Sequence, residues 1–96
     1  MLIVVTYDVN TEDEAGKRRL RKVAKVCVSY GIRVQNSVFE CNVDASQYKL
    51  LKRDVIEKID KEKDSVRFYN LGNQYTSKIE HYGVKNVKDQ ESILLY

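Results

Sequence analysis

The chain has 96 residues, with 17 Lys or Arg and 14 Asp or Glu, so its formal net charge is only +3. A chain of this length forms one domain with one modest core, and so mild a charge does not by itself establish nucleic-acid binding. No segment is long and apolar enough to cross a membrane, and no signal peptide is recognisable, so we expect a single cytoplasmic domain.

The first predicted strand covers residues 2–8 and ends on a carboxylate. Its apolar, β-branched sequence LIVVTYD is typical of a buried strand. A strand that ends on Asp8 places a negative charge at the rim of the sheet, where a small protein can hold a metal ion or a reacting phosphate. The alternative is that Asp8 only starts a turn, because Asp bonds its own backbone two residues on. On Tyr7 and Asp8 alone, the turn is favoured.

The next segment predicts a helix that begins after Thr11 and runs to about Tyr30. Thr11 and Glu14 have the spacing of a capping box, and three acidic residues would lie in the first turn, where the helix dipole favours carboxylates: Glu12, Asp13 and Glu14. This explanation needs no metal cluster. Gly31 is expected to end the helix with a positive φ. The buried stripe is expected to consist of Leu20, Val23, Ala24, Cys27 and Tyr30.

The opposite face of this helix is basic, and no residue between Lys17 and Ser29 is acidic. Its members are Lys17, Arg18, Arg21, Lys22 and Lys25, with Arg19 at the flank. Like charges four residues apart destabilise a helix by roughly 0.2–0.5 kcal/mol per pair. A solvated helix surface is the alternative, but this repulsion favours a phosphate or nucleic-acid partner.

Residues 32–42 interleave polar and apolar residues, as half-buried strands do. The dipeptide Asn36-Ser37 in the middle fits either a tight turn or a bend between two short strands. In a continuous strand, one face would resemble a surface for phosphates or bases and would carry Arg33, Gln35, Ser37 and Phe39. For Phe39 taken alone, packing in the core is the favoured interpretation.

The second half of the chain predicts one more helix and one more strand. Asp44 and Gln47 have the spacing of a capping box. The buried stripe of this helix is expected to contain Tyr48, Leu51, Val55, Ile56 and Ile59. Residues 60–64 have mixed charges and predict a solvated turn, and residues 65–71 predict a strand that Gly72-Asn73 stops.

The tail differs in composition from the rest of the chain. Residues 79–82 predict a short strand, residues 84–92 are polar and resemble a linker, and residues 93–96 are apolar. An apolar terminus after a polar linker is expected to pack on its own domain or on another chain.

The two cysteines predict no disulfide and no metal site. Cys27 and Cys41 are far apart and lack metal-ligand spacing, and His81 is the only histidine. We therefore expect two buried, reduced thiols.

The order of these elements predicts an α+β fold, a ferredoxin-like βαββαβ sandwich with an additional C-terminal strand. Two helices would cover one face of an antiparallel sheet and leave the other face open for dimerisation. We expect a single domain over residues 1–96, with a core of about residues 1–78 and a C-terminal strand and tail over residues 79–96. The fold alone does not give the function.

Four segments resemble the CRISPR-associated protein two family, the small partner of the spacer-acquisition integrase. They are the strand IVVTYD that Asp8 closes, the basic run KRRLRK, the block GIRVQNSVFE over residues 31–40, and SVRFYNLG over residues 65–72. The resemblance covers nearly the whole chain and is most specific in residues 31–40. It implies a homodimer in which the C-terminal strand pairs with the sheet of the other copy.

The resemblance also implies a function and a set of site residues. Family members are metal-dependent endonucleases on single-stranded RNA or duplex DNA, or non-catalytic adaptors that hold duplex DNA and bridge integrase dimers. The family's first-strand aspartate and preceding aromatic match Asp8 and Tyr7, which are the expected catalytic residues. Nucleic acid would contact the matched basic and second-strand positions Lys17, Arg18, Arg19, Arg21, Lys22, Arg33, Ser37 and Phe39.

A magnesium ion is the expected cofactor, with Asp8 as its ligand. Mg²⁺ keeps several waters and is often held by one or two carboxylates plus a substrate phosphate. One Asp8 is too few for a tight site, but two that face each other across a dimer axis are enough to hold one ion weakly. No residue of the sequence stands out as a general base. A toxin ribonuclease on the same fold is a third and more remote alternative.

Overall fold

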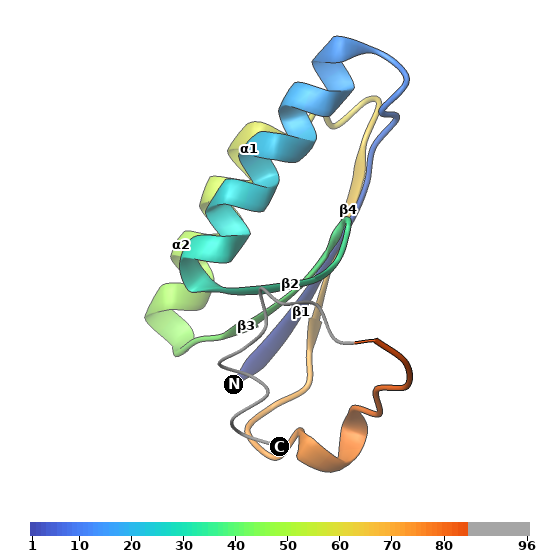
Figure 1. The fold of residues 1–96 in the computed structure, drawn as a ribbon. Helices are drawn as coiled ribbons and strands as arrows, with labels where there is room; N and C mark the ends of the chain where they lie inside the picture. Colours follow the sequence, from blue (N-terminus) through green and yellow to red (C-terminus); the bar gives the residue numbers. More distant parts are fainter. Residues whose placement is uncertain (85–96) are drawn as a thin grey trace.

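The computed structural model describes residues 1–84 of the chain. Its elements follow in the order β1 (Leu2–Asp8), α1 (Glu14–Tyr30), β2 (Gly31–Gln35), β3 (Val38–Asn42), α2 (Ala45–Lys58), β4 (Ser65–Asn70) and the short 3₁₀ helix η1 (Thr76–Lys78). The strands form one antiparallel sheet in the order β2-β3-β1-β4. Both helices cover the same face of this sheet (Figure 1). The predicted βαββαβ order and α+β class are therefore confirmed.

The core lies between the sheet and the two helices. Successive strand residues point to opposite faces, so alternate residues of β1 enter the core. Ile3 and Val5 are fully buried, and Tyr7 is only 2% exposed. These three residues form one hydrophobic cluster with buried residues of β3 and of the two helices. The main partners are Phe39, Cys41, Leu20, Val23, Cys27, Leu51 and Val55. Both cysteines are buried and free of a disulfide, as predicted.

Neither helix covers the second face of the sheet (Figure 1), although Leu2 at one end of this face is only 4% exposed. Val4 and Thr6 of β1 lie on this face, and Asp8 ends the same row. The register places Thr6 between Val38 and Arg67, and it places Asp8 opposite Ser65 of β4. We call this surface the uncovered face. Asp8 and Tyr7, although adjacent in sequence, therefore lie on opposite faces of the sheet.

Helix α1 begins later than predicted, so the Thr11 capping box is wrong. The N-cap is Asp13, whose Oδ1 accepts a hydrogen bond from the Gly16 amide at 2.7 Å. The backbone packs tightly here, because a Cβ on Gly16 would lie 1.7 Å from the carbonyl oxygen of Asn10. The Asp13 cap accounts for the start of the helix at Glu14, and the tight approach to the β1–α1 loop explains why residue 16 is a glycine.

Helix α1 ends at Tyr30 with Gly31 as its C-cap, as predicted, but the positive φ predicted for Gly31 is wrong. Gly31 has φ −170°, which is extended backbone, and it is the first residue of β2. A positive φ is therefore not why glycine is present. A Cβ at Gly31 would lie 2.0 Å from the Glu40 carbonyl oxygen, so glycine is needed for the close approach of β2 to β3.

Helix α2 has the predicted capping box. The Gln47 amide donates to Asp44 Oδ1 at 2.8 Å, and the Asp44 amide donates to Gln47 Oε1 at 3.0 Å. Its stripe contains Leu51 and Val55, but Ile56 is 38% exposed, so that member was predicted wrongly. Residue 56 is one position beyond Val55, and a rotation of 100° takes it off the narrow buried face.

Asn36 and Ser37 form a tight turn between β2 and β3, which resolves the alternatives left by the sequence. A register shift between Arg33 and Gln35 accompanies the turn. Arg33 lies opposite Phe39, so both belong to the helix-covered side.

Of two segments predicted in the tail, one differs from the prediction and the other lies outside the described residues. Residues 79–82 are irregular in the structure, so the strand predicted there is wrong. Gly72 turns the chain with φ +77°, and η1 follows, so this segment does not continue along β4. Residues 93–96 lie outside the described residues, and the additional C-terminal strand and its packing stay predictions. None of the described helices has the length and hydropathy needed to cross a membrane.

Candidate functional site

Asp8 lies in a shallow depression on the uncovered face. The depression has a volume of ≈ 380 Å³ and is lined by Thr6, Tyr7, Asp8, Ser37, Val38, Ser65 and Arg67. Asp8 is exposed, and within the described chain its carboxylate has no hydrogen bond or ion pair. A carboxylate that no protein group neutralises is available to a cation.

Hydroxyl groups and a guanidinium accompany Asp8 in the depression. Ser37 comes from the β2–β3 turn, Ser65 begins β4, and Arg67 follows two residues later on the same face. The guanidinium of Arg67 is held in place because its Nη1 donates to the Tyr69 hydroxyl at 3.0 Å. The arrangement offers an anionic ligand for a metal beside hydrogen-bond donors for a phosphate.

Arg67 and Ser65 were missed by the sequence analysis. The alternation in SVRFYN does place polar residues on one face of β4, which is a usable signal. It does not say which strand β4 pairs with or in which register. Those two facts bring Ser65 and Arg67 beside Asp8.

The donor set fits magnesium only in part. No group of three or more His, Cys, Asp or Glu side chains gathers anywhere in residues 1–84. One chain supplies the carboxylate of Asp8 and neutral hydroxyls, and a second carboxylate or a substrate phosphate has to complete the ligand set. The residues of one chain therefore supply only part of a magnesium ligand set.

Tyr7 has a partner on the helix-covered side, away from Asp8. Its hydroxyl donates a short hydrogen bond to Asp64 Oδ2. Burial raises the pKa of the Tyr7 hydroxyl, and the adjacent carboxylate of Asp64 raises it further, so the proton stays on the oxygen. The Tyr7 hydroxyl therefore lies on the other side of the sheet from the Asp8 carboxylate.

Arg19 is paired as well, and the pairing shows that the turn over residues 60–64 is not merely solvated. Its Nε and Nη2 atoms donate to the two oxygens of Asp64 at 2.8 and 3.1 Å. The Asp64 side chain is fully buried and that of Arg19 is 18% exposed. Burial would raise the pKa of Asp64, but the hydrogen bonds from Arg19, the Asp60 amide and Tyr7 together lower it. Asp64 is therefore a buried carboxylate that stays ionised.

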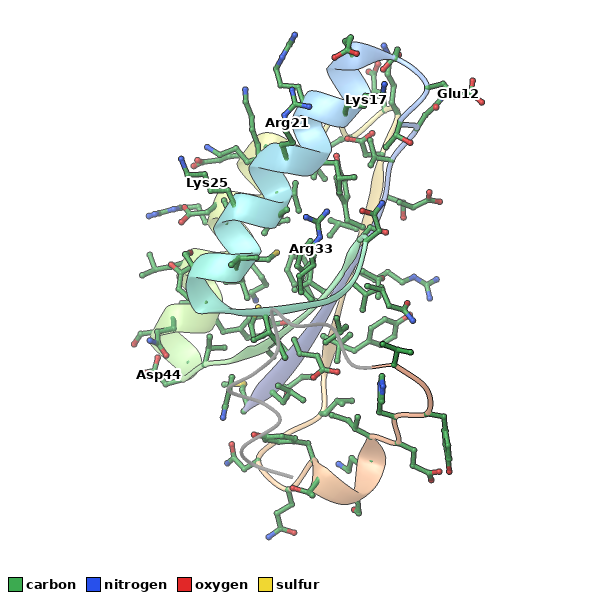
Figure 2. The ribbon with its side chains drawn as sticks, viewed as in Figure 1. Glu12, Lys17, Arg21, Lys25, Arg33 and Asp44 are labelled. Carbon is green, nitrogen blue, oxygen red and sulfur yellow. The ribbon has the colours of Figure 1, made fainter. Side chains whose placement is uncertain are left out.

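The other basic residues of α1 are exposed, as predicted. They form the basic face of α1, which consists of Lys17, Arg18, Arg21, Lys22 and Lys25. Lys17 has an ion pair with Glu14 at 3.6 Å, whereas the remaining four have no ion pair among the described residues. Arg21 and Lys25 extend away from the sheet (Figure 2). The basic face of α1 and the depression around Asp8 thus lie on opposite sides of the molecule.

The residues predicted to contact nucleic acid in the block 31–40 are divided between the core and the surface. Phe39 is fully buried, and the Arg33 guanidinium carbon lies 5.5 Å from the centroid of its ring. Arg33 Nε also donates to the Asn36 carbonyl at 2.8 Å, and the side chain lies between α1 and the sheet (Figure 2). Of the residues predicted to contact nucleic acid, the structure places only Ser37 in the depression with Asp8.

Comparison with known proteins identifies the family. The protein-family model described as "CRISPR associated protein Cas2" matches residues 1–79. The chain belongs to the Cas2 family. The "CRISPR-associated endonuclease Cas2" of Halalkalibacterium halodurans is 54% identical over 96 residues, which cover 100% of both chains. The "CRISPR-associated endoribonuclease Cas2" of Chlorobaculum tepidum is 52% identical over 95 residues, or 99% of each chain.

A solved Cas2 structure has the same fold. The crystal structure of Streptococcus pyogenes Cas2 superposes with a TM-score of 0.80 at 52% sequence identity, covering 86% of this chain and 100% of the other. This similarity confirms the ferredoxin-like architecture and the CRISPR assignment that the sequence motifs predicted.

Proposed function

We propose that this Cas2 protein is a metal-dependent endonuclease that hydrolyses phosphodiester bonds in RNA or duplex DNA during spacer acquisition with the integrase. The observation that carries the proposal is the unpartnered carboxylate of Asp8 in a depression that also holds Arg67 and hydroxyl groups. The names of two relatives, an endonuclease and an endoribonuclease, support the same reaction class.

The proposed site requires a homodimer. The Asp8 residues of two copies, facing each other across a two-fold axis, would together hold one magnesium ion. When bound, the ion supplies a more acidic water and stabilises negative charge on the leaving oxygen. Arg67 would donate hydrogen bonds to the non-bridging phosphate oxygens, and the hydroxyls of Ser37 and Ser65 would fix the orientation of the same phosphate.

Replacing Asp8 by asparagine tests the nuclease directly. We expect Asp8→Asn to lower the cleavage of labelled RNA and duplex DNA in Mg²⁺ at least about tenfold, because the amide cannot neutralise the ion. The matched control is Asp44→Asn, which makes the same change at an exposed helix N-cap where asparagine is equally suitable. Undiminished cleavage by Asp8→Asn would show that this carboxylate is not catalytic.

A non-catalytic adaptor that binds duplex DNA and bridges integrase dimers is the second candidate. The position of the basic face of α1 favours it, because nucleic acid bound there need not reach Asp8 on the other side of the sheet. A wild-type protein that binds duplex DNA and cleaves neither RNA nor DNA would support the adaptor.

The basic face of α1 is the proposed docking surface in both cases. Arg18→Ala combined with Arg21→Ala is expected to weaken duplex binding about tenfold and to reduce the slope of log K against log salt by about 2. Fluorescence anisotropy over a series of salt concentrations measures both quantities. Lys49→Ala with Lys61→Ala removes the same charge from exposed positions outside α1 and serves as the control. Equal salt slopes for the two variants would exclude α1 as the contact surface.

A further inference from the structure

Asp8 depends on its backbone for its position, because its side chain has no partner within residues 1–84. On one side, the Tyr7 amide donates to the Ser37 carbonyl at 2.9 Å. On the other side, Asp8 pairs with Ser65 of β4. Both strand ends that meet at Asp8 therefore have to be fixed for the carboxylate to be fixed.

The carboxylate of Asp64 connects these strand ends from the helix-covered side. Asp64 directly precedes Ser65, and Tyr7 directly precedes Asp8. The Tyr7 hydroxyl donates to Asp64 Oδ2, so a side-chain hydrogen bond links the end of β1 to the start of β4. The link lies beneath the depression rather than inside it.

The same carboxylate is held by two further segments. Arg19 of α1 binds both of its oxygens, and the Asp60 amide of the α2–β4 turn donates to Oδ2 at 2.9 Å. The paired geometry of an Arg fork on a carboxylate fixes the direction as well as the distance of the contact. The fully buried carboxylate thus accepts hydrogen bonds from three segments, and losing any one donor leaves a buried oxygen less well satisfied.

We propose that Asp64, together with Arg19 and Tyr7, is a positioning cluster that fixes Asp8 and Ser65 for the reaction on the uncovered face. The proposal rests on the proposed nuclease function of Asp8. None of the three groups is a catalytic residue in this scheme. Their polar atoms meet on the helix-covered side, and they act through the backbone of β1 and β4.

Tyr7→Phe is the variant that tests the cluster with the smallest change. It removes one hydroxyl and leaves the contacts of Asp64 with Arg19 and Asp60 in place, so we expect it to fold, with Tm lowered by no more than about 10 °C. The matched control is Tyr75→Phe. The Tyr75 hydroxyl accepts from Asn42, which pairs with Leu2 at the far end of β1.

Two readouts separate positioning from a merely structural role. Backbone amide exchange by NMR at Asp8 and Ser65 should be at least about fivefold faster in Tyr7→Phe than in Tyr75→Phe. Turnover at saturating nucleic acid should fall about 10- to 100-fold, because small displacements of a reacting group are costly, while KM stays unchanged.

Unchanged exchange at Asp8 and Ser65 in Tyr7→Phe would overturn the positioning cluster, whether or not turnover falls. A rise in KM with unchanged turnover would overturn it too. A wild-type protein that cleaves nothing would instead overturn the proposed nuclease, and the exchange measurement, which needs no activity, keeps the two failures distinguishable.

Discussion

Replacing Asp64 by alanine is expected to lower the free energy of unfolding by about 3 kcal/mol at neutral pH. The change leaves the Arg19 guanidinium and the buried Tyr7 hydroxyl without their acceptor, and it also removes the acceptor of the Asp60 amide. Losing one partner of a buried, hydrogen-bonded ion pair costs far more than the pair contributes in net terms, because the remaining groups stay desolvated.

Thermal and urea unfolding measure this effect. In a domain of this size, a loss of about 3 kcal/mol lowers Tm by more than about 10 °C. The matched control is Asp54→Ala, which breaks the contact of Asp54 with Arg53 on the surface of α2, where the Arg53 side chain is 61% exposed. We expect little change there, because water and salt screen an exposed pair. Equal destabilisation by both substitutions would contradict the structural role of Asp64.

The destabilisation should depend on pH with a defined sign. The pKa of Asp64 is lower in the folded protein than in the unfolded chain, so the folded state binds fewer protons. The stability contributed by the carboxylate is therefore fully present above about pH 4 and is lost as the pH falls through the folded-state pKa. The difference between wild type and Asp64→Ala should shrink on acidification, and a difference that grows below pH 4 would contradict this assignment.

Phe39→Ala is expected to destabilise the protein by about 3–5 kcal/mol, which is typical of truncating a fully buried aromatic residue. Phe39 lies at the centre of the cluster that joins β1 and β3 to the helices, and it has no exposed surface. Phe39→Leu keeps most of the volume and should cost roughly half as much. Tyr82→Ala, at a residue that is 84% exposed, is the control for losing an aromatic ring outside the core.

The Phe39→Leu variant also tests whether Phe39 contacts nucleic acid. If Phe39 acts only through the core, Phe39→Leu should bind duplex DNA as the wild type does once both are folded. Anisotropy titrations well below the Tm of each variant provide the comparison. A folded Phe39→Leu that has lost binding would restore Phe39 as a contact residue, which its burial argues against.

Local patterns of the sequence predicted much of the fold. The apolar, β-branched run of residues 2–8 predicts β1 with its real ends, because alternation and a terminal Asp are local features. The stripes of α1 and α2 and the Asp44 capping box are equally local, since they depend on neighbours within one or two helical turns. The cap at Asp13 instead of Thr11 and the extended φ of Gly31 are the exceptions, because spacing encodes neither the choice of cap nor the close approach of β2 to β3.

The sequence by itself thus determined the order and type of the elements, the exposed carboxylate at the end of β1, and the basic face of α1, where no residue between Lys17 and Ser29 is acidic. Only the tertiary structure decided how these features relate. Strand register brings Ser65 and Arg67 beside Asp8, and packing buries Asp64 against Arg19, 45 residues away. The sheet separates the basic face of α1 from the depression. Periodicity reports the neighbours of a residue along its own strand or helix, whereas a site depends on the pairing of distant segments, which no local pattern specifies.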